Sequence, residues 1–144
     1  MSKTNTWETD LLNLVFKNVS ASLIGDATGL VGSGTAGSLY VSLHTADPGE
    51  AGDQTTNEAA FTGYARVAVG RGAAWTVTGG SVSPAANIDF PACTGGTATI
   101  THFGVGCSSS GAGKLLYKGT VTPNIAVASG VTARLTTATA ITED

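Results

Sequence analysis

The residues best suited to chemistry in this chain are two histidines, two cysteines and many serines. His44 and His102 both fall in stretches that alternate like β-strands, where a lone histidine is more often a structural hydrogen-bonding residue than a base or a ligand. Zinc binding needs further ligands at characteristic spacing, and Cys93 and Cys107 are too few and too far apart. No G-x-S-x-G elbow is present, although a Ser-His-Asp triad assembled through space stays open. The sequence therefore favours a protein that is not an enzyme.

Two glycine-rich stretches match nucleotide-binding motifs only in part. Residues 32–37 fit G-x-G-x-x-G, but a loop precedes them and a strand is expected after them, whereas dinucleotide binding needs the opposite context. Gly113 and Lys114 lack the earlier glycine and the following Ser or Thr of a phosphate-binding loop. We expect a flexible linker and a hairpin loop at these places, and no cofactor or metal.

A long polar loop, residues 46–60, carries four acidic residues and no basic one. These are Asp47, Glu50, Asp53 and Glu58. Their spacing does not fit the calcium loop of an EF-hand, so solvated carboxylates are favoured, with a salt bridge to a neighbour's basic surface as an intermediate possibility. Loops of this length are usually functional or mobile. We therefore select Asp47 and Glu50 as candidate protein-contact residues.

The composition is poor in charge for a domain of this size. Charged residues make up 12% of the 144 residues, hydrophobic residues 42%, and the net charge is -3. A typical domain carries about 25% charged residues. This favours a surface that neighbouring subunits cover, although a secreted or merely glycine-rich β domain has a similar composition. The scattered Lys and Arg residues form no basic patch, so nucleic-acid binding is not expected.

The chain shows no segment expected to target or span a membrane. The first residues, from Met1 to Thr6, are polar and lead into a helix pattern, so we expect no signal peptide. No apolar run is long enough to cross a bilayer. Without an export signal, Cys93 and Cys107 are expected to be reduced, buried thiols, with a disulfide as the less favoured alternative.

Residues 1–19 are predicted to contain the one helix. Asn5 and Glu8 have the spacing of a capping box, and Lys17 suits the C-terminal end of the helix dipole. The apolar stripe consists of Trp7, Leu11, Leu12, Leu14, Val15 and Phe16. Such a helix can pack on its own domain or dock on a neighbour as an arm. On the second interpretation Trp7, Leu11 and Phe16 are candidate contact residues.

The rest of the chain alternates between short strands and turns. A hairpin turn is expected at 79–80 and a further turn at 123–124, and the tail to residue 144 is expected to fray. Strands are expected at 38–44, 63–69, 74–78, 81–83, 87–90, 98–107, 115–121, 125–127 and 131–136. The pattern predicts a mainly β, jelly-roll-like antiparallel β-sandwich with one N-terminal α-helix. We expect a single domain over 1–144, with the helix or arm at 1–19 and the sandwich at 38–141.

Several strand and turn sequences resemble a known family. They are Leu-Tyr-Val-Ser-Leu-His-Thr-Ala-Asp-Pro-Gly-Glu at 39–50, Thr-Gly-Tyr-Ala-Arg-Val at 62–67, Trp-Thr-Val at 75–77, Asn-Ile-Asp-Phe-Pro at 87–91, Thr-Gly-Gly at 94–96 and Ile-Thr-His-Phe at 100–103. From about Leu11 to about Leu135 the chain resembles small structural proteins of tailed-bacteriophage virions. Members are often labelled tail-fibre-like, and some resemble head-decoration or cement proteins with a jelly-roll fold.

The resemblance implies a structural role in the virion. Its first implication is a capsid decoration (cement) protein that binds the outer head lattice, with the major capsid protein as partner and with dimers or trimers of the chain itself. The location would then be the capsid surface, after assembly in the bacterial cytoplasm. The alternative is a tail or tail-fibre-associated adaptor that contacts the host surface. A carbohydrate-binding domain is less favoured because most Trp and Tyr residues lie in patterns that predict burial. No repeat typical of a fibre shaft is present.

Overall fold

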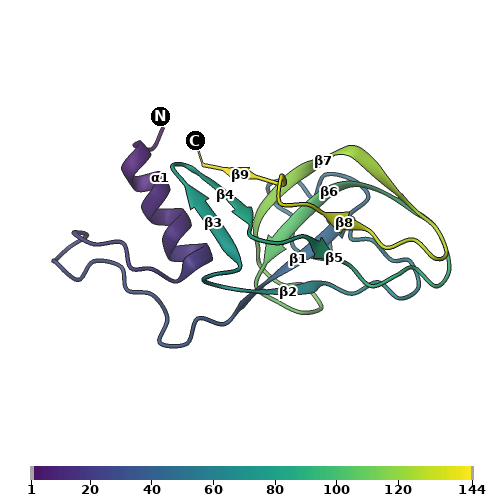
Figure 1. Cartoon of the computed structure of the whole chain (residues 1–144), viewed down its shortest axis with the longest axis horizontal. Coiled ribbons are helices and arrows are strands. Elements are labelled where there is room, and N and C mark those ends of the chain that lie inside the picture. The colour runs from purple at the N-terminus through teal and green to yellow at the C-terminus, as the bar shows by residue number, and fades with distance from the viewer. Residues whose placement is uncertain (1, 144) are drawn as a thin grey trace. The chain divides into compact units, whose positions relative to one another are not determined.

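The structure is a computed structural model, and it describes residues 2–143. Helix α1 (Asn5–Leu12) continues as a π-helical turn, η1 (Asn13–Lys17), and nine strands follow in the described chain (Figure 1). The strands are β1 (Ser38–His44), β2 (Val67–Gly70), β3 (Trp75–Thr78), β4 (Ser81–Pro84), β5 (Ile88–Asp89), β6 (Ala98–Gly106), β7 (Leu115–Val127), β8 (Arg134–Leu135) and β9 (Ile141–Thr142). The fold is mainly β with antiparallel sheets and one N-terminal helix, consistent with the predicted β-sandwich.

The described chain divides into two compact units. The first unit combines residues 2–38, 70–87 and 136–143, and the second combines 39–69 and 88–135. The first holds the helix and the three-stranded sheet β3-β4-β9. The second holds most of the four-stranded sheet β2-β1-β6-β7 and the short pair β5-β8.

Helix α1 begins one residue earlier than the capping-box pattern predicts. Thr4 is the N-cap, because its backbone is extended and its hydroxyl oxygen accepts a hydrogen bond from the Trp7 amide at 3.5 Å. Asn5 is already helical, so the predicted pairing of Asn5 with Glu8 as a capping box is wrong. At the other end, Asn18 takes a left-handed conformation with φ 60°, and its backbone N–H donates to the Asn13 carbonyl. This conformation stops the helix.

The helix is fixed to its own unit by buried apolar residues. Leu12 and Phe16 are fully buried, and the ring of Phe16 meets Trp75 of β3 edge-on at a centroid distance of 4.8 Å. The hairpin predicted at residues 79–80 is confirmed and joins β3 to β4. Residue pairs in contact along this helix face therefore come from segments about 60 residues apart in the chain.

Residues 141–143 of the C-terminal tail pair with β4, so the prediction that the tail frays is wrong for these residues, and residue 144 lies outside the described part of the chain. Strand β9 pairs antiparallel with β4, with Val82 opposite Ile141. The side chain of Ile141 is buried, and the Glu143 amide donates to the Gly80 carbonyl at 2.9 Å. The Glu143 carboxylate also pairs with Lys3 at 3.1 Å. The hydrogen bonds to β4 and the buried Ile141 side chain stabilise this segment, although its Thr- and Ala-rich composition predicts a loose terminus.

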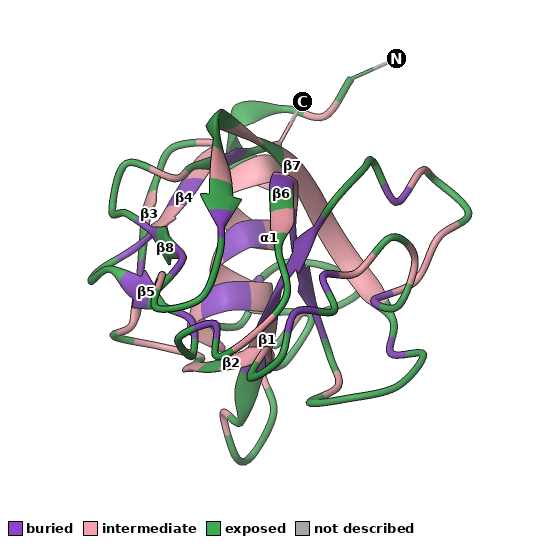
Figure 2. Cartoon of the chain, turned by 90° about the vertical axis from the view of Figure 1, so that its right-hand side faces the viewer, coloured by how far each residue is buried: buried purple, intermediate pink, exposed green. Residues whose placement is uncertain are grey.

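Strands β1 and β6 form the centre of the second unit and are mostly buried (Figure 2). They pair antiparallel from Tyr40 opposite Gly106 to His44 opposite His102. The predicted alternation of β1 is correct, but its second face is also covered, since Ser42 and His44 are fully buried with Leu43. A strand in the middle of a sheet loses exposure on both faces when loops cross it.

Strand β7 runs through the position where a turn is predicted. It continues from Leu115 to Val127 and pairs with β6 on both sides of the cis Thr122–Pro123 bond. Ile100 lies opposite Ile125, whereas His102 lies opposite Thr120, so residues 121–124 bulge out of the ladder. Proline lacks an amide donor and is tolerated in an edge strand at such a bulge. The turn predicted at 123–124 is therefore wrong.

The long loop between β1 and β2 is fastened by a buried amide side chain. The Gln54 side chain is fully buried, its Nε2 donates to the Tyr40 carbonyl at 3.3 Å, and its Oε1 accepts from the Ser108 amide at 2.9 Å. Its backbone amide donates to the Gly113 carbonyl at 3.0 Å. A β carbon on Gly106 would lie 2.2 Å from the Gln54 side chain, so the amide occupies the space that a side chain would fill.

Candidate protein-interaction site

The helix residues selected from the sequence differ in what they leave for a partner. Phe16 is fully buried against Trp75, so it has no exposed surface to offer a neighbour. Trp7 and Leu11 are half-buried on α1. The Phe16 side of the helix therefore packs on its own unit and does not act as an arm that docks on a neighbour. Only Trp7 and Leu11 retain contact surface.

The acidic loop residues Asp47 and Glu50 lie together and share one lysine of the same unit. Lys118 of β7 pairs with the Asp47 carboxylate at 3.0 Å and with the Glu50 carboxylate at 3.2 Å. The pKa of Asp47 lies below its usual range, because its carboxylate accepts from the Gly49 amide and then from Lys118. The same pairing raises the pKa of Lys118. The Glu50 side chain is 96% exposed, so both acids remain accessible.

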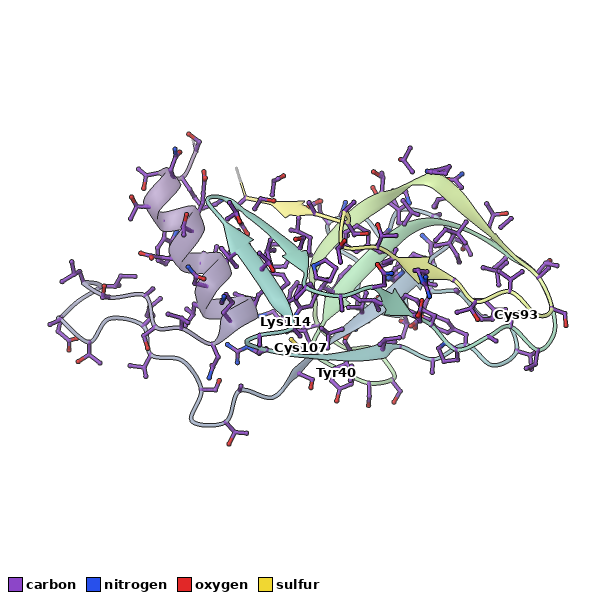
Figure 3. All side chains as sticks on the ribbon, viewed as in Figure 1. Tyr40, Cys93, Cys107 and Lys114 are labelled. Carbon is purple, nitrogen blue, oxygen red and sulfur yellow. The ribbon has the colours of Figure 1, made fainter. Side chains whose placement is uncertain are left out.

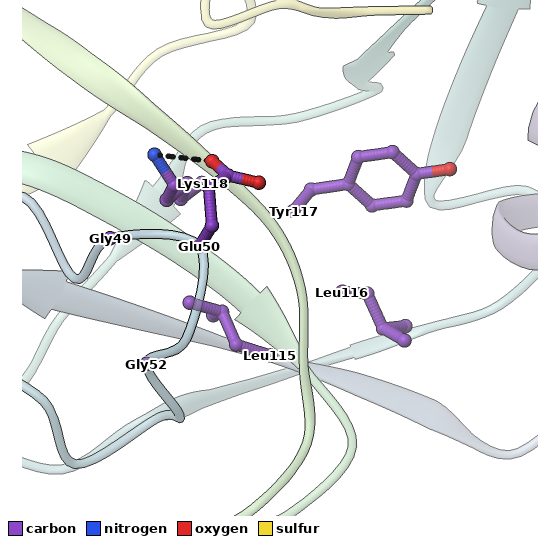
Figure 4. A pocket seen from close by; sticks show the side chains of 7 residues that line it. All are labelled: Gly49, Glu50, Gly52, Leu115, Leu116, Tyr117 and Lys118. Atoms are coloured by element: carbon purple, nitrogen blue, oxygen red, sulfur yellow. Dashed lines mark ion pairs between the residues drawn. The ribbon is translucent and has the colours of Figure 1, made fainter.

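A shallow pocket of about 200 Å³ lies beside this charge cluster. Figure 4 shows the Lys118 ammonium facing the Glu50 carboxylate, while Leu116 and Tyr117 project from β7 on another side. The lining residues are Gly49, Glu50, Gly52, Leu115, Leu116, Tyr117 and Lys118. The pocket is therefore lined partly by the Lys118–Glu50 ion pair and partly by the apolar side chains of β7.

The other two loop acids do not join this cluster. Asp53 accepts from the amide and hydroxyl of Thr55 at 2.8 and 2.6 Å, which lowers the pKa of Asp53. Glu58 pairs with Arg66, as described below. No group of three or more His, Cys, Asp or Glu side chains within residues 2–143 is placed to hold a metal ion. The four acids of the loop therefore divide among three sets of partners, with Lys118 shared by Asp47 and Glu50.

Arg66 is the best-satisfied charged group of the second unit. Its Nε and Nη2 donate to both oxygens of Glu58 at 2.6 and 2.8 Å, and the Arg66 side chain is only 2% exposed. Its remaining donors reach the carbonyls of Ser108 and Gly111. The Tyr64 hydroxyl donates to Glu58 at 2.9 Å, and burial raises the pKa of Tyr64. This network joins the long loop to the β6–β7 turn.

His44 and Ser42 form a buried hydrogen-bonded pair, whereas His102 is half-buried and its Nδ1 lies 2.9 Å from the Thr101 hydroxyl oxygen. His44 Nε2 lies 2.8 Å from Ser42 Oγ, and His44 Nδ1 lies 2.8 Å from the Thr56 carbonyl oxygen. Burial lowers the pKa of His44. A serine bonded to a histidine that a third group orients is the arrangement of an activated nucleophile, but the Ser42 and His44 side chains are both fully buried in the sheet. The pair fits the structural role predicted for a histidine in a strand.

The cysteines are unpaired and lie on separate parts of the second unit (Figure 3). Cys93 is buried, as predicted, and its thiol donates to the Gly95 carbonyl at 3.2 Å. Cys107 is exposed, so the prediction that both thiols are buried is wrong for Cys107. It directly follows β6, where the strand ends and the chain enters the exposed turn.

Sequence reasoning missed the most exposed apolar surface of the described chain. Among residues 2–143, the large hydrophobic side chains that are exposed are Val19, Leu23, Ile24, Leu30 and Val31. Leu23 is 82% exposed and Val31 is 64% exposed. All five lie in residues 18–33, which we call the finger. Its glycines and serines indicate a loop, and the five apolar residues within that loop were the available signal for an interaction surface.

The finger is held in shape by polar contacts at its neck. Asn18 and Ser33 exchange two hydrogen bonds, of 2.8 and 2.7 Å, between the Asn18 side chain and the Ser33 backbone. Further along, Ala21 and Leu30 exchange two backbone hydrogen bonds of 3.0 and 2.8 Å. A β carbon on Gly29 would lie 2.0 Å from the Ala21 carbonyl oxygen, so only glycine allows the two sides to approach this closely.

Arg71 binds the backbone on both sides of the base of the finger. Its guanidinium donates to the Val15 and Leu14 carbonyls at the end of the helix, at 2.6 and 2.5 Å. It also donates to the Ala36 carbonyl at 3.1 Å and to the Ser33 hydroxyl at 3.2 Å. The carbonyls of the last turn of a helix, here those of Leu14 and Val15, lack partners within the helix, and a cation is favourable at that end. Arg71 therefore joins the chain entering the finger to the chain leaving it.

Comparisons with known proteins identify the family of this chain. No helix in residues 2–143 is both long and apolar enough to span a membrane. A search of the curated proteins finds no match. The model of one family, described as Podophage GP4 fiber I protein gp80, matches residues 2–142. The chain therefore belongs to this family of phage virion structural proteins.

Proposed function

We propose that the chain is a fibre-associated structural subunit of a phage tail, which acts by binding other virion proteins and not by catalysing a reaction. The observation that carries the proposal is the family match over residues 2–142, whose description names a fibre protein. The match covers nearly the whole chain, so it includes both compact units. The proposal therefore places the tail role, which the sequence resemblance implies only as the alternative, before the capsid-decoration role.

Two features of the structure support a role in protein contact. The finger exposes five large apolar side chains on a frame of internal hydrogen bonds. Large exposed apolar patches on soluble proteins commonly mark interaction sites. The Asp47–Glu50–Lys118 cluster adds a second accessible surface that can form salt bridges with a neighbour. Trp7 and Leu11 remain candidate contact residues on the helix.

A head-decoration role is the second candidate. It is favoured by one observation, the absence from the sequence of any repeat of the kind that builds an elongated fibre shaft. In that role the chain would bind the major capsid protein on the outer shell. Small subunits can stabilise such a lattice through many modest contacts.

Cryo-electron microscopy of the intact particle tests the two candidates against each other. We expect density with this fold on the tail, repeated with the symmetry of the tail. Density repeated over the icosahedral shell would overturn the tail assignment and establish decoration. Labelling particles with an antibody raised against the full chain gives an independent readout of the same question, because bound antibody would mark one end of the particle or the whole head.

A further inference from the structure

The finger is an exposed apolar surface with a conformation fixed by internal hydrogen bonds. Its five large apolar side chains are the exposed ones among residues 2–143, and Leu23 near its tip is 82% exposed. Hydrogen bonds between Asn18 and Ser33 and between Ala21 and Leu30 fix its conformation. A surface that is already ordered loses little conformational entropy on binding. The finger is therefore suited to associate without refolding.

The finger contains isolated β-bridges but no strand, and it lacks the residues that commonly protect an exposed edge from pairing with another molecule. Residues 18–37 contain no proline, lysine or arginine. By contrast, edge strand β7 carries Pro123, a bulge at 121–124 and Lys118. Natural proteins commonly protect exposed edges with such residues and bulges. One exposed edge of this chain is thus protected and the finger is not.

Two opposite charges lie at opposite ends of the finger. Asp26 is at the tip, where its Oδ1 accepts from the amides of Thr28 and Gly29 at 2.8 and 3.1 Å. Lys17 is at the base, as the last residue of η1. Within the described part of the chain, neither residue forms an ion pair. Two fingers laid side by side in opposite directions would bring each Asp26 close to the Lys17 of the other.

We propose that the finger is covered by the finger of a second copy of this chain, in an antiparallel, two-fold symmetric pair. The exposed large apolar side chains of the described chain are confined to the finger, so the finger of a second copy is the surface that best matches them in apolar character. The two-fold arrangement makes each contact twice and pairs Asp26 with Lys17 at both ends. This inference goes beyond the proposed function, because it holds whether the chain resides on the tail or on the head.

The size of the finger sets the expected strength of this pair. A standard interface takes roughly 20–30 residues from each side, and the finger spans residues 18–33. The contact is therefore somewhat smaller than standard, and its core is apolar. We expect a reversible dimer with a dissociation constant on the order of micromolar. Assembly on a particle would raise the local concentration and favour the pair further.

Sedimentation velocity of the full chain measures the pair directly. From about 1 to about 100 µM, which brackets a micromolar dissociation constant, we expect the mass to rise from one copy to two. Leu23→Glu places a charge in the contact and should keep the chain monomeric across this range. Ser109→Glu adds the same charge to an exposed turn of the second unit and should dimerise like the wild type. Circular dichroism confirms that both variants fold.

Three results of this experiment would overturn the proposal. A wild-type chain that stays monomeric would leave the finger to a different protein. An oligomer that Leu23→Glu does not affect would place the contact elsewhere. A mass other than two copies would contradict the two-fold arrangement.

A charge cycle tests the antiparallel direction. Asp26→Asn keeps the side-chain oxygen that accepts from the turn amides but removes the charge, so in the wild-type background it should weaken the dimer several-fold. Lys17→Glu should also weaken it, because two carboxylates would then face each other. In the Lys17→Glu background, Asp26→Asn should strengthen the dimer, since it removes that repulsion. The same effect of Asp26→Asn in both backgrounds would contradict the arrangement.

Cross-linking locates the symmetry axis. If Asp26 of one copy faces Lys17 of the other, the axis lies near the midpoint of this segment, at Ser22, which is exposed. In a Cys107→Ser background, Ser22→Cys should therefore form a disulfide-linked dimer under mild oxidation, because a disulfide needs α carbons within about 7 Å. The matched variant Ser109→Cys should not. Failure of Ser22→Cys to cross-link in solutions that are dimeric by sedimentation would contradict the proposed register.

Discussion

Arg66→Met should destabilise the protein strongly, because it leaves the largely buried Glu58 carboxylate without its cation. Arg66 is 2% exposed and Glu58 is 17% exposed, and two of the Arg66 hydrogen bonds go to both oxygens of Glu58. Removing one partner of a buried ion pair costs about 3–5 kcal/mol. Since Glu58 keeps the Tyr64 hydroxyl and some contact with water, we expect a loss of about 3 kcal/mol in the free energy of unfolding.

Urea unfolding measures this loss. With a denaturant dependence of about 2 kcal/mol per molar, the midpoint should fall by about 1.5 M. Arg134→Met is the matched control, because Arg134 also makes two hydrogen bonds to one carboxylate, that of Asp89, but both side chains are about half exposed. Exposed ion pairs contribute little, so the control should unfold close to the wild type.

The second half of a double-mutant cycle tests the reason for the loss. Glu58→Gln keeps an acceptor for the Tyr64 hydroxyl and removes the charge. The double variant with Arg66→Met should therefore be more stable than Arg66→Met alone, by about 1 kcal/mol. If Arg66→Met unfolds within error of the Arg134→Met control, the burial argument is refuted. If Glu58→Gln brings no recovery, the loss comes from the carbonyls of Ser108 and Gly111 instead.

Three further predictions concern the helix, the pH dependence and the thiols. Phe16→Ala removes a fully buried ring that meets Trp75 at 4.8 Å, and should cost about 3–5 kcal/mol in urea unfolding followed by tryptophan fluorescence; a cost near zero would mean that the helix is not fixed at this point. Burial lowers the pKa of His44 from 6.5, so the stability it contributes is present above about pH 6.5 and is lost as the pH falls below this value towards the lowered pKa. His44→Gln should therefore flatten the decline of the urea midpoint between about pH 7 and pH 5, and an unchanged decline would exclude His44 as its source. Iodoacetamide should alkylate Cys107 in the native protein and Cys93 only after unfolding, as read by mass spectrometry, and early alkylation of Cys93 would contradict its burial.

The elements predicted well are those whose signals are local. The alternation in residues 38–44 and 98–107 predicts β1 and β6 almost to their ends, and the two glycines at 79–80 predict the hairpin between β3 and β4. Side-chain periodicity and turn chemistry act over a few residues, so a single sequence contains them. The helix was predicted on the same basis, with an error of one residue at its cap.

The errors arise where distant segments decide the structure. Strand β7 continues through Pro123 because β6 lies alongside it and the bulge absorbs the extra residues. Strand β9 exists because β4 offers an edge, although its own residues indicate a loose tail. The predicted strands at 63–69 and 131–136 are shorter in the structure, as β2 begins at Val67 and β8 contains two residues. Such pairings depend on tertiary context.

The candidate site shows the same division. The exposure of Asp47 and Glu50 follows from the polar loop that carries them, but their partner Lys118 is about 70 residues away in the chain. The burial of Phe16 depends on Trp75, which the helix pattern does not contain. The finger required knowledge of which apolar residues the fold leaves uncovered, and no local pattern specifies this.

The buried amide of Gln54 couples positions that are distant in the sequence. Its side chain fills the space beside Gly106, where an added β carbon would lie 2.2 Å away. A larger residue at 106 is therefore compatible with the fold only if residue 54 becomes smaller, and a smaller residue at 54 alone leaves a cavity and unpaired backbone groups of Tyr40 and Ser108. During divergence, neither position can change freely without the other. Among homologous chains, residues 54 and 106 are thus expected to covary, and the pair gives a marker for aligning distant sequences across this loop.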